Sequence, residues 1–173
     1  MYLSVRELDI RKIPFKEELA PGVMEWDEGV EQQTPVFVSG EASLDESTEE
    51  IRVVGHLKVD LRFSCDRCLK PIDLAIDDDF ELLYQPPPEA TPGQELEIHG
   101  EDIDVGFYDG EGIELNDVFR EQILLMLPSR ALCEPGCKGL CPSCGANLNS
   151  ETCNCVKPVL DDRWAGLRKL AGK

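Results

Sequence analysis

The sequence has few of the apolar segments that membrane or secreted proteins need. Its longest uninterrupted apolar run is residues 123–127, far short of the roughly 18 residues that indicate a membrane span. The first fifteen residues include charged side chains at Arg6, Glu7, Asp9, Arg11 and Lys12. The beginning of the chain therefore lacks the apolar region of a secretory signal. We expect a cytoplasmic protein with no membrane partner.

Basic residues are scarce, and the shortage is uneven along the chain. The sequence holds 17 Lys and Arg against 35 Asp and Glu, a net charge of −18. Residues 71–129 contain 1 basic and 16 acidic residues, whereas residues 130–173 contain 7 and 4. The middle segment should repel a phosphate backbone and attract a cationic protein. A solvated acidic surface without a partner is the alternative interpretation.

Catalytic motifs are absent. The sequence contains no phosphate-binding G-x-x-x-x-G-K-[ST], no G-x-S-x-G, no H-E-x-x-H and no dinucleotide fingerprint. There are 2 histidines, neither beside a cysteine. His56 falls on the charged face of a predicted strand, so we expect it to be solvated rather than to serve a cysteine nucleophile. We expect no enzyme and no small-molecule substrate.

Two alternating runs are the strongest signal of regular structure. Apolar residues occupy odd positions from Ile51 to Cys65 and even positions from Ile72 to Tyr84. This period of two predicts a long β-hairpin, with a bulge at Gly55. Residues 36–38 should add a third strand, because an isolated hairpin is marginal in water. Residues 103–108 predict a short strand.

A central helix is predicted to begin at the cap residue Asn116 and to run to Leu127, where Pro128 ends it. Asp117 suits the positive end of its dipole. The expected packing face comprises Leu115, Val118, Phe119, Gln122, Leu125 and Met126. A short C-terminal helix, capped by Asp161 or Asp162, would present Trp164, Leu167 and Leu170.

These elements predict an α+β fold: an antiparallel β-sheet with a long hairpin, one central helix, a cysteine-rich zinc-binding segment and a short C-terminal helix. We expect a β-rich domain with the central helix in residues 1–130. Residues 131–173 would form a cysteine-rich zinc module with the C-terminal helix packed on it.

The 8 cysteines are the sharpest chemical feature. They fall into four close pairs: Cys65 and Cys68, Cys133 and Cys137, Cys141 and Cys144, Cys153 and Cys155. In the reducing cytoplasm such pairs hold metal more often than they form disulfides. Zinc prefers four thiolates in a tetrahedron, and a tight turn offers two of them. Eight ligands would complete two structural zinc sites.

Only a short loop separates the pair Cys141–Cys144 from the pair Cys153–Cys155. Closing a short loop costs little entropy, so the spacing favours these two pairs in one site. The pair Cys65–Cys68 at the hairpin turn would then meet the pair Cys133–Cys137. The spacing leaves a different partition open. It also leaves open one zinc ion, an iron–sulfur cluster and thiol redox chemistry.

The outer face of the hairpin invites an RNA-binding interpretation. Cations lie along it at Arg52, His56, Lys58 and Arg62, with Arg67 and Lys70 at the turn. If Cys65 lies opposite Ile72, then Lys58 faces Asp79 and Asp60 faces Asp77. Cross-strand charge pairs would neutralise much of this stripe, which leaves the turn as the better RNA candidate.

The order and spacing of several motifs resemble the YceD family, the large ribosomal RNA subunit accumulation proteins of bacteria and plastids. The motifs are Cys65-Asp66-Arg67-Cys68-Leu69, residues 121–128, Cys133, residues 137–149, Cys153-Asn154-Cys155 and Asp162-Arg163-Trp164. The resemblance covers residues 53–170. It implies a role in synthesis, processing or stability of 23S ribosomal RNA and hence in assembly of the large ribosomal subunit.

Three functions remain open after this resemblance. The first is an assembly factor that binds large-subunit RNA or a preribosomal particle. Its candidate RNA-binding residues are Arg67, Lys70, Arg130, Lys138, Lys157, Arg163, Arg168 and Lys169. The second is an acidic escort for a basic ribosomal protein, without direct RNA contact. The third is a cytosolic zinc or thiol buffer.

Overall fold

The structure, a computed structural model, describes residues 1–27, 29–88, 105–108 and 111–155. The chain divides into two compact units. The first unit comprises Met1–Phe63 and Ile72–Ser129, and the second comprises Ser64–Pro71 and Arg130–Lys173. The turn of the long hairpin thus groups with residues after Arg130 rather than with the strands that lead to it. The two units are described separately below.

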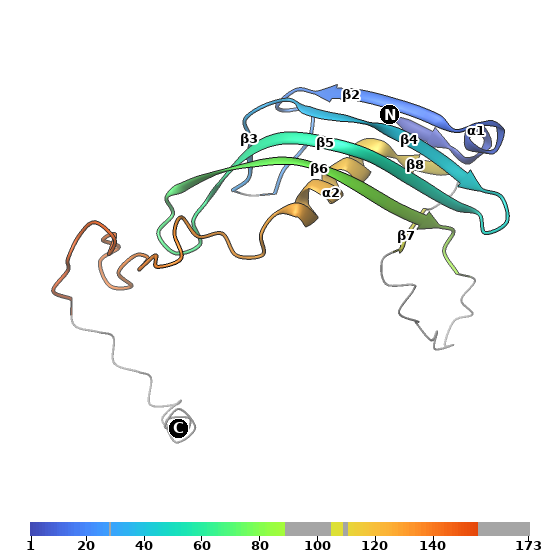
Figure 1. The fold of residues 1–173 in the computed structure, drawn as a ribbon. Coiled ribbons are helices and arrows are strands. Elements are labelled where there is room, and N and C mark those ends of the chain that lie inside the picture. The colour runs from blue at the N-terminus through green and yellow to red at the C-terminus, as the bar shows by residue number, and fades with distance from the viewer. Residues whose placement is uncertain (28, 89–104, 109–110, 156–173) are drawn as a thin grey trace, which may run out of the picture. The chain divides into compact units, whose positions relative to one another are not determined.

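The described elements follow one another as β1 (Tyr2–Ser4), α1 (Val5–Ile10), β2 (Ile13–Leu19), β3 (Glu31–Gln32), β4 (Val36–Asp45), β5 (Glu50–Ser64), β6 (Pro71–Gln85), β7 (Val105–Phe107), β8 (Gly112–Glu114) and α2 (Leu115–Met126) (Figure 1). The larger sheet has the order β2-β4-β5-β6-β7, with β3 also paired to β5, and β1 pairs with β8 in a small second sheet. The fold is α+β, as predicted. The sheet is mixed rather than wholly antiparallel, because β7 joins β6 in parallel.

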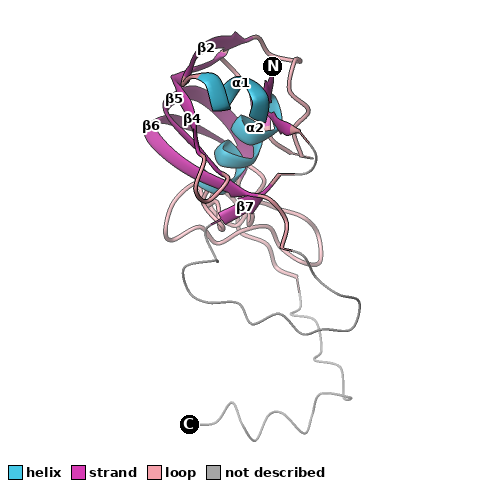
Figure 2. Ribbon diagram, turned by 90° about the vertical axis from the view of Figure 1, so that its right-hand side faces the viewer, coloured by secondary structure: helices cyan, strands magenta, loops and turns pink. Residues whose placement is uncertain are grey.

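The long hairpin is confirmed, with 15 residues in each of β5 and β6. The odd positions of β5 are buried as predicted: Ile51, Val53, Leu57, Val59 and Leu61 are each at most 1% exposed. These side chains lie on the face that α1 and α2 cover, and both helices lie on the same side of the sheet (Figure 2). The predicted strand at residues 36–38 is the start of the ten-residue β4.

Paired glycines create the space that the aromatic core needs. Gly55 lies in regular register opposite Gly40, so the predicted bulge at Gly55 is wrong. A Cβ atom at Gly55 would lie 2.9 Å from the Phe80 ring, and one at Gly40 would lie 2.7 Å from the Phe15 ring. Both rings pack with Phe119 of α2, at centroid distances of 6.2 and 5.4 Å. The glycines therefore admit aromatic rings.

The central helix is confirmed, although its first residue and packing face differ from the prediction. Glu114 occupies the cap position without a side-chain cap hydrogen bond, so Asn116 lies inside the first turn and does not cap the helix. Ile123 is fully buried and Leu125 is 78% exposed. The predicted packing face wrongly included Leu125 and omitted Ile123. Phe119 and Ile123 lie one turn apart and both face the core.

Four N-terminal elements, β1, α1, β2 and β3, were not predicted because their apolar spacing shows no clear period. The predicted short strand is observed as β7. The predicted C-terminal helix, with Asp161, Asp162, Trp164, Leu167 and Leu170, lies outside the described residues. Among the described residues, no helix combines the length and apolar character needed to cross a membrane.

Candidate metal centres and the hairpin turn

The second unit contains two clusters of four cysteines. The first cluster comprises Cys65, Cys68, Cys133 and Cys137, and the second comprises Cys141, Cys144, Cys153 and Cys155. Within each cluster the sulfur atoms lie within 4.8 Å of one another. This grouping is the one that loop closure favoured. The first cluster thus connects the hairpin turn to the chain that follows α2.

The distances between sulfurs fit a shared tetrahedral cation. Cys65 and Cys137 have their Sγ atoms 3.8 Å apart, and those of Cys68 and Cys133 are 3.6 Å apart. Four sulfurs at about 2.3 Å from a common zinc ion would lie about 3.8 Å from each other. A disulfide would require about 2.05 Å, and all eight cysteines are free. Either cluster could therefore hold a metal ion through four thiolates.

The clusters differ in their access to solvent. In the first, Cys65, Cys68 and Cys137 are buried, whereas in the second Cys144 and Cys155 are exposed. A four-thiolate site keeps no open coordination position, so it is structural rather than catalytic. Metal in the second cluster should exchange more readily with solvent ligands.

Backbone N–H groups favour thiolate at the leading cysteine of each cluster. Burial raises the pKa of Cys65, but N–H hydrogen bonds from Cys133, Arg67 and Cys68 lower it to about 6. The N–H groups of Ser143 and Cys144 likewise lower the pKa of Cys141 to about 6. Burial, followed by the neighbouring sulfurs, raises the pKa of Cys133 to about 12. Each cluster therefore has a ready thiolate, and a divalent cation would offset the repulsion that opposes ionising the others.

Two turns of the second unit have the same backbone hydrogen bonds. At the hairpin, Leu69 N donates to Cys65 O at 2.9 Å and Cys65 N donates to Lys70 O at 2.8 Å. At the second cluster, Gly145 N donates to Cys141 O at 2.9 Å and Cys141 N donates to Ala146 O at 2.8 Å. Residues 65–70 and 141–146 thus form matching turns that each carry two cysteines, here called the first and second knuckles.

Asn149 supports the first cluster, and sequence reasoning did not single it out. Its Nδ2 donates to Cys137 Sγ at 3.3 Å, and its Oδ1 accepts the Lys138 N–H at 2.7 Å. Its own N–H donates to Asn147 Oδ1 at 3.0 Å. Partners of this kind orient metal ligands and tune their basicity. The only signal in the sequence is an asparagine just after the second knuckle, within the quoted motif 137–149.

The predicted RNA-binding residues differ in what they contact. Arg67 donates from its guanidinium to Cys137 O at 2.6 Å, and its own carbonyl accepts the Leu140 N–H at 3.0 Å. It is thus part of the scaffold around the first cluster. Lys70, Arg130 and Lys138 are exposed. The remaining candidates, Lys157, Arg163, Arg168 and Lys169, lie outside the described residues.

The outer face of the hairpin in the first unit is a ladder of ion pairs. The pairs are Arg52–Glu81 at 2.7 Å, His56–Asp79 at 2.8 Å, Lys58–Asp77 at 2.7 Å and Arg62–Asp73 at 2.6 Å. The expected facing of Lys58 with Asp79 was wrong by two residues, because Cys65 N pairs with Lys70 O and sets the strands in a different register. The stripe is neutralised, as the alternation of charges predicted.

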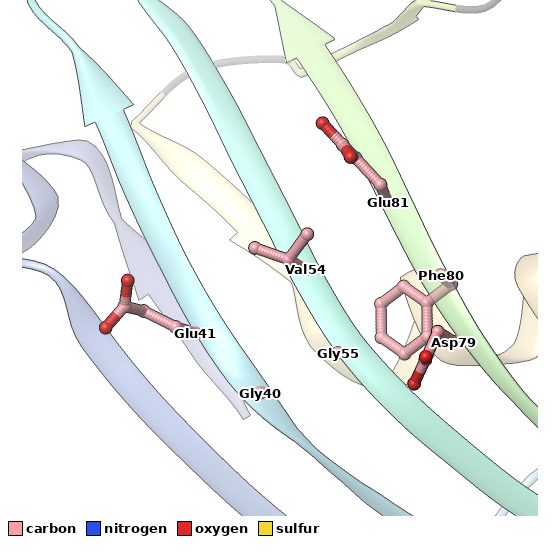
Figure 3. A pocket seen from close by; sticks show the side chains of 7 residues that line it. All are labelled: Gly40, Glu41, Val54, Gly55, Asp79, Phe80 and Glu81. Carbon is pink, nitrogen blue, oxygen red and sulfur yellow. The ribbon is translucent and has the colours of Figure 1, made fainter.

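A shallow pocket lies on this sheet around the glycine pair (Figure 3). It is lined by Gly40, Glu41, Val54, Gly55, Asp79, Phe80 and Glu81. Its three carboxylates already have cationic partners: Glu41 contacts Lys12, Asp79 contacts His56 and Glu81 contacts Arg52. These contacts account for its acidic lining, so the clusters of the second unit are the stronger functional candidates.

The protein is thus an α+β chain in which a long hairpin ends in a cysteine knuckle, with two four-cysteine clusters that could hold metal. The comparisons identify the family. A sequence profile described as "Large ribosomal RNA subunit accumulation protein YceD" matches residues 53–171. The chain belongs to the YceD family.

Several curated proteins are similar to this chain. An uncharacterized protein of Mycobacterium tuberculosis is 32% identical over 125 residues, covering 72% of this chain and 58% of the relative. The chloroplastic "Large ribosomal RNA subunit accumulation protein YCED homolog 1" is 29% identical in Zea mays and 28% in Arabidopsis thaliana. These matches cover 73% and 79% of this chain, and 50% and 49% of the plant proteins. The chain thus spans about half the length of these relatives. No solved structure matches it significantly.

Proposed function

We propose that this protein is a non-enzymatic cytoplasmic factor in the synthesis, processing or stability of 23S ribosomal RNA, acting during assembly of the large ribosomal subunit. Its second unit contacts RNA of the preribosomal particle. Membership of the YceD family supports the process, and the printed names of the plant relatives refer to accumulation of large-subunit ribosomal RNA.

The RNA contact is supported by a difference between the two units in the ion pairing of their basic residues. The first unit has 8 basic and 30 acidic residues. Its described ion pairs involve six of those cations: Arg6, Lys12, Arg52, Lys58, Arg62 and Arg120. The second unit has 9 basic and 5 acidic residues, and no ion pair is found among its described residues. Cations without carboxylate partners are available to phosphate.

Two structural zinc ions would hold this unit in shape. Four clustered thiolates are the donor set that zinc prefers, and each closed site leaves a net charge of about −2. The first ion would fix the knuckle that presents Lys70. The metal therefore positions cations rather than performing chemistry.

The experiment measures RNA binding as a function of salt. We choose Lys70, Arg130 and Lys138 for substitution by Gln and leave Arg67 intact, because its guanidinium binds the Cys137 carbonyl. Arg11 and Lys16, exposed cations of the first unit, provide the matched control when changed to Gln. On single-stranded 23S fragments the triple variant should reduce the log–log salt slope by about two. An unchanged slope, or no binding by the native protein, would contradict RNA contact by the second unit.

A second candidate is an escort for a basic ribosomal protein, which the 8 basic and 30 acidic residues of the first unit favour. Charge attraction of this kind speeds association and selects cationic partners. Binding of isolated basic large-subunit proteins, lost when acidic residues of the first unit are neutralised, would support it. A function as a zinc or thiol buffer stays a prediction. Rapid metal exchange from both clusters would favour it.

A further inference from the structure

Leu69 adopts a backbone conformation that leucine rarely takes. Its φ is 60°, in the left-handed region, and the matching position of the second knuckle is Gly145, with φ 75°. Both residues donate the same N–H hydrogen bond to the leading cysteine, Leu69 to Cys65 and Gly145 to Cys141. Glycine takes this conformation without steric cost, whereas a side chain does not. The backbone conformation of the knuckle therefore does not require leucine at this position.

The Leu69 side chain does not repay this cost by packing. It is 63% exposed, although leucine is the kind of residue that normally enters a core. Strained residues that persist are found at functional sites, so the strain itself points to a contact outside the molecule. The turn holds this apolar side chain next to the exposed cation Lys70.

We propose that Leu69 is an apolar RNA contact that lies against an unpaired nucleobase, while Lys70 binds the adjoining phosphate. This rests on the proposed function and names the chemistry of its site. Apolar side chains can wedge against or between bases, and single-stranded loops are where RNA exposes base faces. The described cations of the second unit have no ion-pair partner among the described residues, which favours RNA over an apolar pocket on a protein.

The test compares Leu69→Gly, which removes the side chain and the strain together, with Leu69→Met, which keeps an apolar contact. Leu125 of α2, also an exposed leucine, gives the control Leu125→Ala. The probes are a 23S fragment with unpaired loops and a fully paired RNA duplex of equal length. Zinc content and melting temperature are measured on every variant.

We expect Leu69→Gly to keep its zinc and to melt no lower than the native protein, while its affinity for the looped fragment falls by at least about fivefold. The salt slope should stay unchanged, because no cation is lost. Preference for loops over duplex should diminish, Leu69→Met should restore most of the affinity, and Leu125→Ala should change nothing.

Three results would overturn this inference and leave the proposed function standing. The first is native affinity of Leu69→Gly for the looped fragment. The second is a lower zinc content or a lower melting temperature in that variant. The third is that Leu69→Gly loses binding to a ribosomal protein and keeps its binding to RNA. Absence of RNA binding by the native protein would overturn both proposals.

Discussion

Asn149 lies outside the four cysteines of the first cluster but is hydrogen-bonded to one of them. It donates to Cys137 Sγ at 3.3 Å and accepts from the Lys138 backbone at 2.7 Å. The amide thus stabilises a thiolate and fixes the chain that carries it. A ligand list alone would miss this contribution.

Changing Asn149 to Ala should weaken zinc binding at the first cluster by about 10- to 100-fold, because Cys137 loses a donor and the turn loses its lock. Competition with a chromophoric chelator measures this affinity. Ser150→Ala is the control, since the Ser150 hydroxyl makes only a 3.4 Å contact with Asn147 O. Equal affinity in the two variants would show that Asn149 does not support the site.

His56 lies between two carboxylates on the exposed ladder, with Asp79 at 2.8 Å and Asp77 at 2.9 Å. Its hydrogen bond to Asp79, followed by that to Asp77 and their charges, raises its pKa above 6.5 despite some desolvation. Lys58 also contacts Asp77 and lowers the pKa of that carboxyl. The folded protein therefore holds the His56 proton more tightly than the unfolded chain does.

Stability from His56 should be fully present below about pH 6.5 and should be lost as pH rises through the raised pKa of the folded state. Urea midpoints at about pH 5.5 and about pH 8.5 should differ in this direction for the native protein. In His56→Gln the part of the difference due to this residue should vanish. An identical pH dependence in both proteins would exclude the effect.

At the scale of elements, the sheet depends on two strands that approach closely at Gly40 and Gly55. A Cβ atom added to Gly40 would lie 2.1 Å from Val54 O, a backbone atom that cannot move without disturbing β5. The same position would crowd the Phe15 ring that packs on Phe119 of α2. The aromatic packing between sheet and helix thus depends on two residues without side chains.

Gly40→Ala should lower the free energy of unfolding by about 1–3 kcal/mol, or more if β4 and β5 separate locally. The measurement is the urea unfolding curve. Gly136→Ala is the control, because a Cβ atom there would meet nothing within 4 Å. A Gly40→Ala midpoint equal to that of the control would mean that the strands can separate at little cost.

At the scale of the whole molecule, the two units depend on different interactions. The first has an apolar core of side chains from strands and both helices. Apart from Gly139, the buried residues in the described part of the second unit are Cys65, Cys68, Cys137 and Cys141. We therefore predict that metal ligation replaces a hydrophobic core in the second unit, as it does in small metal-bound modules.

Replacing Cys141 and Cys144 together by Ser should remove one of about two zinc ions per chain and leave the first cluster loaded. Amide exchange should accelerate after Cys137, while the strands of the first unit keep their protection. Elemental analysis and hydrogen-exchange mass spectrometry measure the two effects. Loss of both ions, or deprotection of β5 and β6, would show that the clusters are not independent.

Features that depend on local spacing could be predicted before the fold was known. Alternation from Ile51 onward specified β5 and its buried face, and Pro128 specified the end of α2. Close cysteine pairs specified knuckles, since two or three intervening residues suffice to form such a turn. Short loop length also anticipated which pairs would meet.

Features that depend on residues distant in the chain could not be predicted and were established by the fold. The Gly40–Gly55 pair is explained by the rings of Phe15 and Phe80, which approach from other strands. Asn149 reaches Cys137 because the chain folds back after the second knuckle. The offset of the ion pairs follows from the register set at the hairpin turn. Local patterns specify elements, whereas long-range packing decides which neighbours each side chain receives.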